Sequence, residues 1–171
     1  MSGQAEERVV LGLGGNLGDP ARAMGEALRL LDQGPDTRVA AVSPLYRTPP
    51  WGKTDQPDFL NAAAELRTRL SPHDLLELCL DAEHKLKRVR NERWGPRLID
   101  IDILLFGDRR VQEPGLDIPH PRLLERAFVL VPLAAIAPDL VMDGRTIAEH
   151  ALSVEQAGIE ELPSGRDWWK A

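Results

Sequence analysis

Cysteine, aromatic side chains and long apolar runs are all scarce in this chain of 171 residues. Its single cysteine, Cys79, excludes an intrachain disulfide, and its position beside leucines in a helical pattern is typical of a small core residue. No apolar run approaches the roughly 20 residues that a membrane-spanning helix needs, and residues 1–8 are polar where a secretory signal would be apolar. We therefore expect a cytoplasmic protein that binds no membrane.

An excess of positive charge is lacking as well. The chain carries 21 Lys and Arg residues against 27 Asp and Glu residues, a formal net charge of −6. General binding to nucleic acid is therefore not expected. Internal repeats and low-complexity segments are also missing, and the length suits one domain with a sizeable core.

The glycine-rich segment that follows Leu11 lacks the features of a nucleotide-binding loop. Gly12 and Gly14 are not followed by the third glycine of a dinucleotide-binding turn, and the Lys-Ser/Thr pair of a P-loop is absent. We interpret the segment as a tight turn from a strand into a helix, which Asp19 caps and Pro20 opens.

What the chain does have is the stretch Arg93–Phe106, which reads RWGPRLIDIDILLF. Its second half alternates β-branched and apolar residues with acids, a pattern that predicts a strand. Residues two apart on a strand lie about 6.6 Å apart on the same face, so Asp100 and Asp102 should project together, with the isoleucines on the other face. Two carboxylates at that separation suit a pair of divalent cations roughly 3.5–4 Å apart, which can clamp a transferring phosphoryl group.

A basic run precedes these acids and consists of Lys85, Lys87, Arg88, Arg90, Arg93 and Arg97. Anion-binding side chains beside candidate metal ligands indicate a phosphate site. The alternative is a solvated surface, because half-exposed strands commonly alternate apolar and acidic residues. The Arg-Trp-Gly-Pro-Arg loop that leads directly into the two carboxylates favours the phosphate site.

The predicted elements follow the order strand, helix, strand, strand, helix, strand. They are a strand at Val9–Leu13, a helix from Pro20, a strand at Thr37–Ser43 continuing through Arg47, a strand at Phe59–Leu66, a helix from Pro72 capped by Ser71, and the strand with the two aspartates. This βαββαβ order predicts an α+β fold with a ferredoxin-like core, an antiparallel sheet with helices on one face. We expect additional C-terminal helices to cover the other face. The first and last strands of the βαββαβ order should lie side by side at the centre of the sheet.

Three further residues have two possible interpretations. Trp51, in a proline-rich loop, either covers the core or forms part of a ligand wall, and Glu83, on the apolar stripe of the second helix, faces either the rim or a site. His120 stands between Pro119 and Pro121. A lone histidine is more often a structural hydrogen-bonding group, but the flanking prolines fix its direction and favour a functional role. His150 is expected at the surface.

Five other motifs accompany Arg93–Phe106 in the segment from about Val9 to Pro138. They are Gly14–Asp19, Tyr46–Pro50, Asp55–Ala62, Pro119–Pro121 and Arg126–Leu130. Taken together they closely resemble the 6-hydroxymethyl-7,8-dihydropterin pyrophosphokinase family of folate biosynthesis. The resemblance implies transfer of pyrophosphate from ATP to the hydroxymethyl group of 6-hydroxymethyl-7,8-dihydropterin, giving AMP and the pterin diphosphate. We expect a single pyrophosphokinase domain over residues 1–171, with residues 158–171 as a C-terminal tail, working as a monomer.

The resemblance further implies roles for individual residues. Asp100 and Asp102 would bind two Mg²⁺ ions and form the catalytic set with Arg88 and Arg97. The pterin would be bound by Thr48, Pro49, Trp51, Phe59, Asn61 and Phe128, with its ring between the two phenylalanines. ATP would be bound by Glu83, Arg88, Arg90, Trp94, Arg97, Ile103, His120 and Arg126. We also expect residues 88–97 to close as a lid over ATP.

Two other functions share the predicted topology. One is a two-metal nucleotidyl transferase or cyclase, which would release pyrophosphate rather than AMP. The other is a non-catalytic module that binds nucleotides or RNA. The acidic net charge argues against RNA, as does the lack of aromatic residues at alternate positions on the strand with the two aspartates.

Overall fold

The computed structural model describes residues 5–50, 55–87 and 99–170. Its centre is a six-stranded antiparallel sheet in the order β10-β3-β4-β1-β5, with β2 also paired to β4. The strands are β1 (Glu7–Gly15), β2 (Thr37–Val42), β3 (Tyr46–Thr48), β4 (Phe59–Thr68), β5 (Asp100–Phe106) and β10 (Glu160–Glu161). The long strand β4 pairs with β3 through its first residues and with β2 through its last. The predicted α+β class is confirmed.

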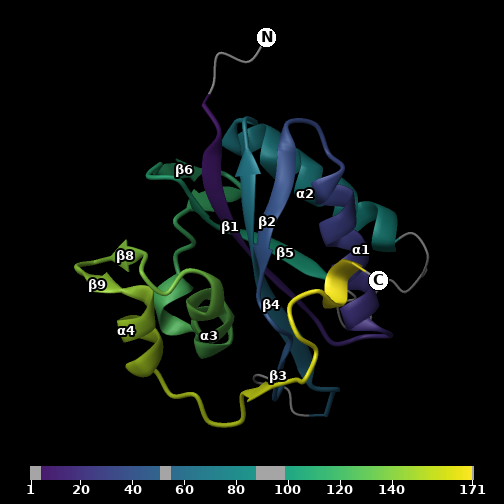
Figure 1. Ribbon diagram of the computed structural model, residues 1–171, viewed down its shortest axis with the longest axis vertical. Helices are drawn as coiled ribbons and strands as arrows, with labels where there is room; N and C mark the ends of the chain where they lie inside the picture. The colour runs from purple at the N-terminus through teal and green to yellow at the C-terminus, as the bar shows by residue number, and fades with distance from the viewer. Residues whose placement is uncertain (1–4, 51–54, 88–98, 171) are drawn as a thin grey trace.

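Helices α1 (Pro20–Asp32) and α2 (Pro72–Lys87) cover one face of the sheet (Figure 1). Both begin where the sequence predicts: Asp19 Oδ1 accepts a hydrogen bond from the backbone N of Arg22 at 3.2 Å, and Ser71 Oγ accepts one from that of Asp74 at 3.1 Å. Their apolar stripes pack against alternate residues of the strands. The core between the layers includes Leu11, Leu13, Met24, Leu28, Leu75, Ile101 and Ile103, together with Cys79. The interpretation of Cys79 as a core residue is confirmed.

The opposite face carries α3 (Ala127–Ile136), which packs on β4 through Leu130 and Leu133 (Figure 1). Helix α4 (Ile147–Leu152) lies against α3. The remaining elements are the hairpin β6 (Val111–Glu113) with β7 (Leu116–Ile118), the hairpin β8 (Val141–Met142) with β9 (Arg145–Thr146), and the 3₁₀ turns η1 (Leu123–Glu125) and η2 (Trp168–Lys170). None of the described helices has the length and apolar character needed to cross a bilayer.

Three expectations need correction. The strand expected over residues 37–47 is two strands, β2 and β3, separated at Ser43–Leu45, where Pro44 has no N–H to donate. Strands β1 and β5 do lie side by side, but within the described residues β5 pairs with β1 alone and is therefore an edge strand. His150 is buried rather than at the surface, because α4 packs against the β8–β9 hairpin and the Nε2 atom of His150 lies 2.7 Å from the carbonyl oxygen of Met142.

Candidate active site

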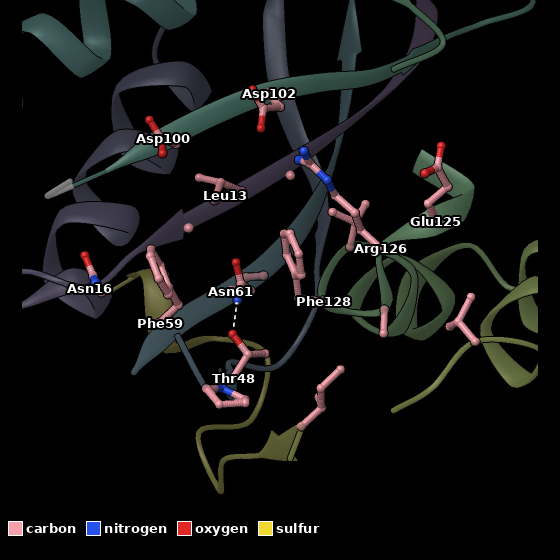
Figure 2. A pocket seen from close by; sticks show the side chains of 18 of the residues that line it. Leu13, Asn16, Thr48, Phe59, Asn61, Asp100, Asp102, Glu125, Arg126 and Phe128 are labelled. Carbon is pink, nitrogen blue, oxygen red and sulfur yellow. Dashed lines mark hydrogen bonds between the residues drawn. The ribbon is translucent and has the colours of Figure 1, made fainter. Parts of the chain in front are cut away.

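A cleft of about 990 Å³ opens on the sheet face that α3 only partly covers (Figure 2). Its floor is formed by β1, β4 and β5, and its sides by β3, by the start of α3 and by residues 154–159. The cleft brings together these residues predicted from the sequence: Thr48, Pro49, Phe59, Asn61, Asp100, Asp102, Arg126 and Phe128. Segments far apart in the chain therefore converge on one site.

The two predicted metal-binding carboxylates lie on one face of β5, as the alternation predicts. Asp100 is half-buried and Asp102 is exposed in the cleft, whereas Ile101 and Ile103 are buried on the helix side. In the pairing of β1 with β5, Gly14 is opposite Asp100 and Gly12 is opposite Asp102. Because glycines stand across from both acids, no side chain of β1 covers them at these positions.

The donor set fits Mg²⁺. This ion prefers oxygen ligands and is usually bound by one or two carboxylates, with its remaining positions taken by water and by substrate phosphates. Asp100 and Asp102 supply two carboxylates, and no cluster of three or more candidate metal ligands occurs among the described residues. A site of this kind is completed by a phosphate-bearing substrate rather than by the protein alone.

Glu83 faces this strand from behind rather than lying at the rim of the second helix. Its carboxylate accepts a hydrogen bond from the backbone N–H of Ile101, between the two aspartates. Cys79 lies in the same layer, where burial, reinforced by the charges of Glu83 and Asp102, raises the pKa of its thiol to about 12. A thiol with that pKa stays protonated at neutral pH and is therefore no nucleophile.

A slot between two phenylalanines, with polar groups at its base, occupies the other part of the cleft. The side-chain Nδ2 of Asn61 donates a hydrogen bond to Thr48 Oγ1 at 2.8 Å, and both residues are buried. Figure 2 shows Phe59 and Phe128 to either side of Asn61. Gly14 fits tightly against this amide, since a Cβ at its position would lie 2.6 Å from Asn61 Oδ1.

Arg126 is the cation that the described residues contribute to the cleft. It precedes α3, and its guanidinium carbon lies 5.6 Å from the centre of the Phe128 ring, within the range of a cation–π contact. Figure 2 shows the guanidinium directed toward the side of the cleft where Asp102 lies. It therefore lies between the aromatic slot and the carboxylate pair, where a charged phosphate chain would pass.

Asn16 lies in the Gly14–Asp19 motif without a predicted role of its own, and it lines the cleft. It is only 3% exposed, and its Nδ2 donates to Gln56 Oε1 at 2.8 Å and to the carbonyl oxygen of Pro57 at 3.2 Å. These bonds join the turn after β1 to the loop that leads into Phe59. Glu125 and residues 154–159 are further lining segments that no sequence pattern indicated.

Three residues assigned to ATP by the resemblance, Glu83, Ile103 and His120, lie outside the lining of the cleft. The side chain of Ile103 is in the helix-side core. His120 donates its backbone N–H to Leu104 O at 3.0 Å, and its Nδ1 accepts from the backbone N of Arg122 at 3.2 Å. Burial lowers the pKa of His120, although the nearby charge of Asp102 acts in the opposite direction. Trp51, Arg88, Arg90, Trp94, Arg97 and the lid expected at residues 88–97 lie outside the described residues.

A carboxylate pair at one end of a cleft, an aromatic slot at the other and a cation between them are the elements of an enzyme that transfers phosphoryl groups from a nucleotide. The comparisons with known proteins agree. The family model for 7,8-dihydro-6-hydroxymethylpterin-pyrophosphokinase (HPPK) matches residues 10–138, and the chain belongs to this family.

Relatives extend the likeness over most of the chain. The 2-amino-4-hydroxy-6-hydroxymethyldihydropteridine pyrophosphokinase of Methylorubrum extorquens is 52% identical over 155 residues, which cover 91% of this chain and 98% of that protein. The Pseudomonas aeruginosa protein of the same name is 47% identical, with 92% and 98% covered. Among solved structures, wild-type Plasmodium falciparum HPPK-DHPS with pteroate has a similar fold, with a TM-score of 0.71 at 16% identity. That likeness covers 87% of this chain and 44% of the other.

Proposed function

We propose that this cleft transfers a pyrophosphoryl group from ATP to the hydroxymethyl group of 6-hydroxymethyl-7,8-dihydropterin, giving AMP and the pterin diphosphate. As a member of the pyrophosphokinase family, the chain is a diphosphokinase of folate biosynthesis. The observation that carries the assignment to this cleft is that the aspartate pair and the slot of Phe59, Asn61 and Phe128 line the same cavity. Both reactants can therefore be held in one place.

The pterin is assigned to the slot. A planar bicyclic ring gains stacking energy between Phe59 and Phe128, and its polar edge needs hydrogen-bonding partners at the base. The hydroxyl of Thr48 and the amide of Asn61 are already oriented by the hydrogen bond between them. Side chains held in this way lose little freedom when a ligand binds, which favours affinity.

The triphosphate is assigned to the carboxylate end. Asp100 and Asp102 would hold two Mg²⁺ ions, which when bound neutralise phosphate charge. Arg126 would contact the phosphates between the two subsites, and Arg88 and Arg97 would do so from the segment outside the described residues. The contribution of these residues is alignment of the pterin hydroxyl with the β-phosphorus of ATP, because phosphoryl transfer depends mainly on positioning and charge stabilisation.

We also propose that the core is of the ferredoxin-like βαββαβ type, in a single domain over residues 1–171 that works as a monomer. If β2 and β3 are counted as one interrupted strand, the four core strands are β1, β2/β3, β4 and β5 along the chain. Across the sheet they follow the order β5, β1, β4, β2/β3, which is the order of a ferredoxin-like core. Helices α1 and α2 lie on one face, as that arrangement requires. Light scattering on the purified protein tests the monomer.

Product analysis tests the reaction. The protein is incubated with Mg²⁺, ATP and the reduced hydroxymethylpterin, and the nucleotides and pterins are separated by chromatography. We expect one AMP for each pterin diphosphate, and no consumption of ATP when the pterin is omitted. Stoichiometric ADP would indicate a simple kinase and free pyrophosphate a nucleotidyl transferase, and either result would overturn the proposal.

A further inference from the structure

The last part of the chain contributes a wall to the cleft although it lies outside the segment that the family model matches. We call residues 154–170 the C-terminal strap. Val154, Glu155, Ala157 and Ile159 of the strap line the cleft, whereas the family match ends at residue 138. The pterin end of the site is therefore closed by residues that the shared family motifs do not include.

The strap is attached to the strand that carries Thr48. Its residues Glu160 and Glu161 form β10, which pairs antiparallel with Arg47 and Tyr46 of β3. The backbone N of Leu162 donates to the carbonyl oxygen of Leu45 at 2.8 Å. Since β3 has only three residues, pairing on both of its edges, with β4 and with β10, fixes its position.

A second attachment lies beyond β10. The indole Nε1 of Trp168 donates to the carbonyl oxygen of Ser43 at 2.8 Å, and Arg29 Nη1 donates to the carbonyl oxygen of Trp169 at 2.6 Å. The Trp169 side chain is 8% exposed and belongs to the core on the α1 side of the sheet. The strap thus crosses from the cleft past the sheet edge to α1, where the C-terminus lies (Figure 1).

The strap also contacts Pro49, the residue after Thr48. A Cβ at Gly158 would lie 3.0 Å from Cγ and 3.2 Å from Cδ of the Pro49 ring, so the glycine backbone packs directly on the proline. Gly158 has a φ of +84°, a backbone conformation that residues other than glycine rarely adopt. Glycine is therefore favoured at this position both by the space and by the backbone conformation.

We propose that the C-terminal strap is the outer wall of the pterin subsite and sets the affinity for the pterin. Half-buried Val154 and Ile159 provide apolar surface toward the substrate, while Gly158 and β10 act as positioning elements that hold Pro49 and Thr48 against β4. This inference rests on the assignment of the slot to the pterin. It adds residues 154–159 to the determinants of pterin recognition, and it leaves ATP affinity independent of them.

Steady-state kinetics on Ile159→Ala and Gly158→Ala test the wall, with KM for each substrate measured at saturation of the other. Loss of a partly buried apolar side chain from the wall should raise the pterin KM by about three- to tenfold in Ile159→Ala. Ile159→Val should restore most of the affinity, and Gly158→Ala should raise the pterin KM further. The KM for ATP should stay within about twofold of the original value, a split that general destabilisation would not produce.

Leu152→Ala is the matched control, because Leu152 is 83% exposed just before the strap and does not line the cleft. Thermal melting establishes that each variant is folded, and if Gly158→Ala does not fold, Ile159→Ala decides the question. Unchanged pterin KM in folded Ile159→Ala would overturn the inference, as would an equal rise in both KM values. Phe128→Leu separates the two proposals: if it too leaves the pterin KM unchanged, the slot itself is wrongly assigned, whereas a rise in Phe128→Leu alone rejects only the strap.

Discussion

The carboxylate of Glu83 accepts a hydrogen bond from the backbone N–H of Ile101, with 2.6 Å between oxygen and nitrogen. This contact joins α2 to β5 at the residue between Asp100 and Asp102. Because β5 pairs with β1 alone among the described strands, Glu83 provides the partner that an adjacent strand would otherwise offer. A charge-assisted bond at this point fixes the direction of the strand on which both candidate metal ligands stand.

Replacing Glu83 should therefore affect turnover through the position of β5. Glu83→Ala leaves the buried N–H of Ile101 without this partner, which costs about 1–3 kcal/mol of folding free energy. Because β5 carries both aspartates and would lose this support, we expect kcat to fall by about tenfold or more. Glu83→Gln retains an oxygen that can accept the same hydrogen bond and should recover most of that loss. Titration of kcat with Mg²⁺ for both variants is the measurement. Equal losses in the two variants would mean that the charge of Glu83, and not its hydrogen bond, matters.

The aspartate pair should be essential for turnover and dispensable for folding. Asp100→Asn and Asp102→Asn keep the shape of the side chain but lose the charge that binds a divalent cation, so kcat should fall by at least about 100-fold in each. Both side chains leave β5 on the cleft side, and the core residues Ile101 and Ile103 are untouched. Melting temperatures should thus stay close to that of the original protein. A variant with near-normal kcat at saturating Mg²⁺ would exclude that residue as a metal ligand.

Cys79 provides a prediction on pH. Its thiol has a pKa of about 12 in the folded protein against an ordinary value of 9.0, so above about pH 9 the unfolded chain loses the proton first. The stability that depends on the protonated thiol is therefore complete below pH 9 and is lost as the pH rises toward 12. Denaturant titrations between pH 8 and pH 11 should show the free energy of unfolding falling, with a weaker fall in Cys79→Ala once its lower baseline is subtracted. If the free energy of unfolding fell with pH equally steeply in both proteins, the raised pKa of the Cys79 thiol would be contradicted.

The sequence predicts local structure well wherever one local signal determines it. Period-two alternation places Asp100 and Asp102 on one face, and the Asp19-Pro20 and Ser71-Pro72 pairs mark where helices begin. The order of strands across the sheet is different, because it depends on which distant segments pair. Nothing in the alternation around Asp100 distinguishes an edge strand from a central one, and that part of the prediction was wrong.

The candidate site divides in the same way. The motifs identified Thr48, Asn61 and Phe128, and the structure brings them to one cleft. Residues 154–159 could not be found from local patterns, since they line the cleft only because the strap pairs with β3. Asn16 lies in the Gly14–Asp19 motif, but its place in the cleft depends on the turn after β1 meeting Gln56, which the motif does not show. His150 was misplaced for a similar reason: its burial comes from the packing of α4 against the β8–β9 hairpin, which no periodicity around His150 indicates.

The two glycines of β1 opposite the aspartates offer a paired test of the slot. A methyl group at Gly14 would lie 2.6 Å from Asn61 Oδ1, so Gly14→Ala must displace the amide and weaken its bond to Thr48 Oγ1. A methyl group at Gly12 would lie 3.4 Å from the Leu104 side chain, a contact that this flexible chain can absorb. We therefore expect Gly14→Ala to raise the pterin KM by about tenfold, the equivalent of roughly 1.4 kcal/mol, and Gly12→Ala to have a much smaller effect.

Gly12 and Gly14 both pair with the strand that carries the aspartates, so an added methyl group can also disturb the carboxylates. The KM for ATP distinguishes such a disturbance from displacement of the Asn61 amide. If Gly14→Ala acts through Asn61, the pterin KM rises while the ATP KM and the Mg²⁺ dependence stay near their original values. Combining Gly14→Ala with Asn61→Ala provides the final check. Once the amide is removed the added methyl group has nothing to displace, so the double variant should bind the pterin no worse than Asn61→Ala alone. Additive losses would show that Gly14 acts on the cleft by another route.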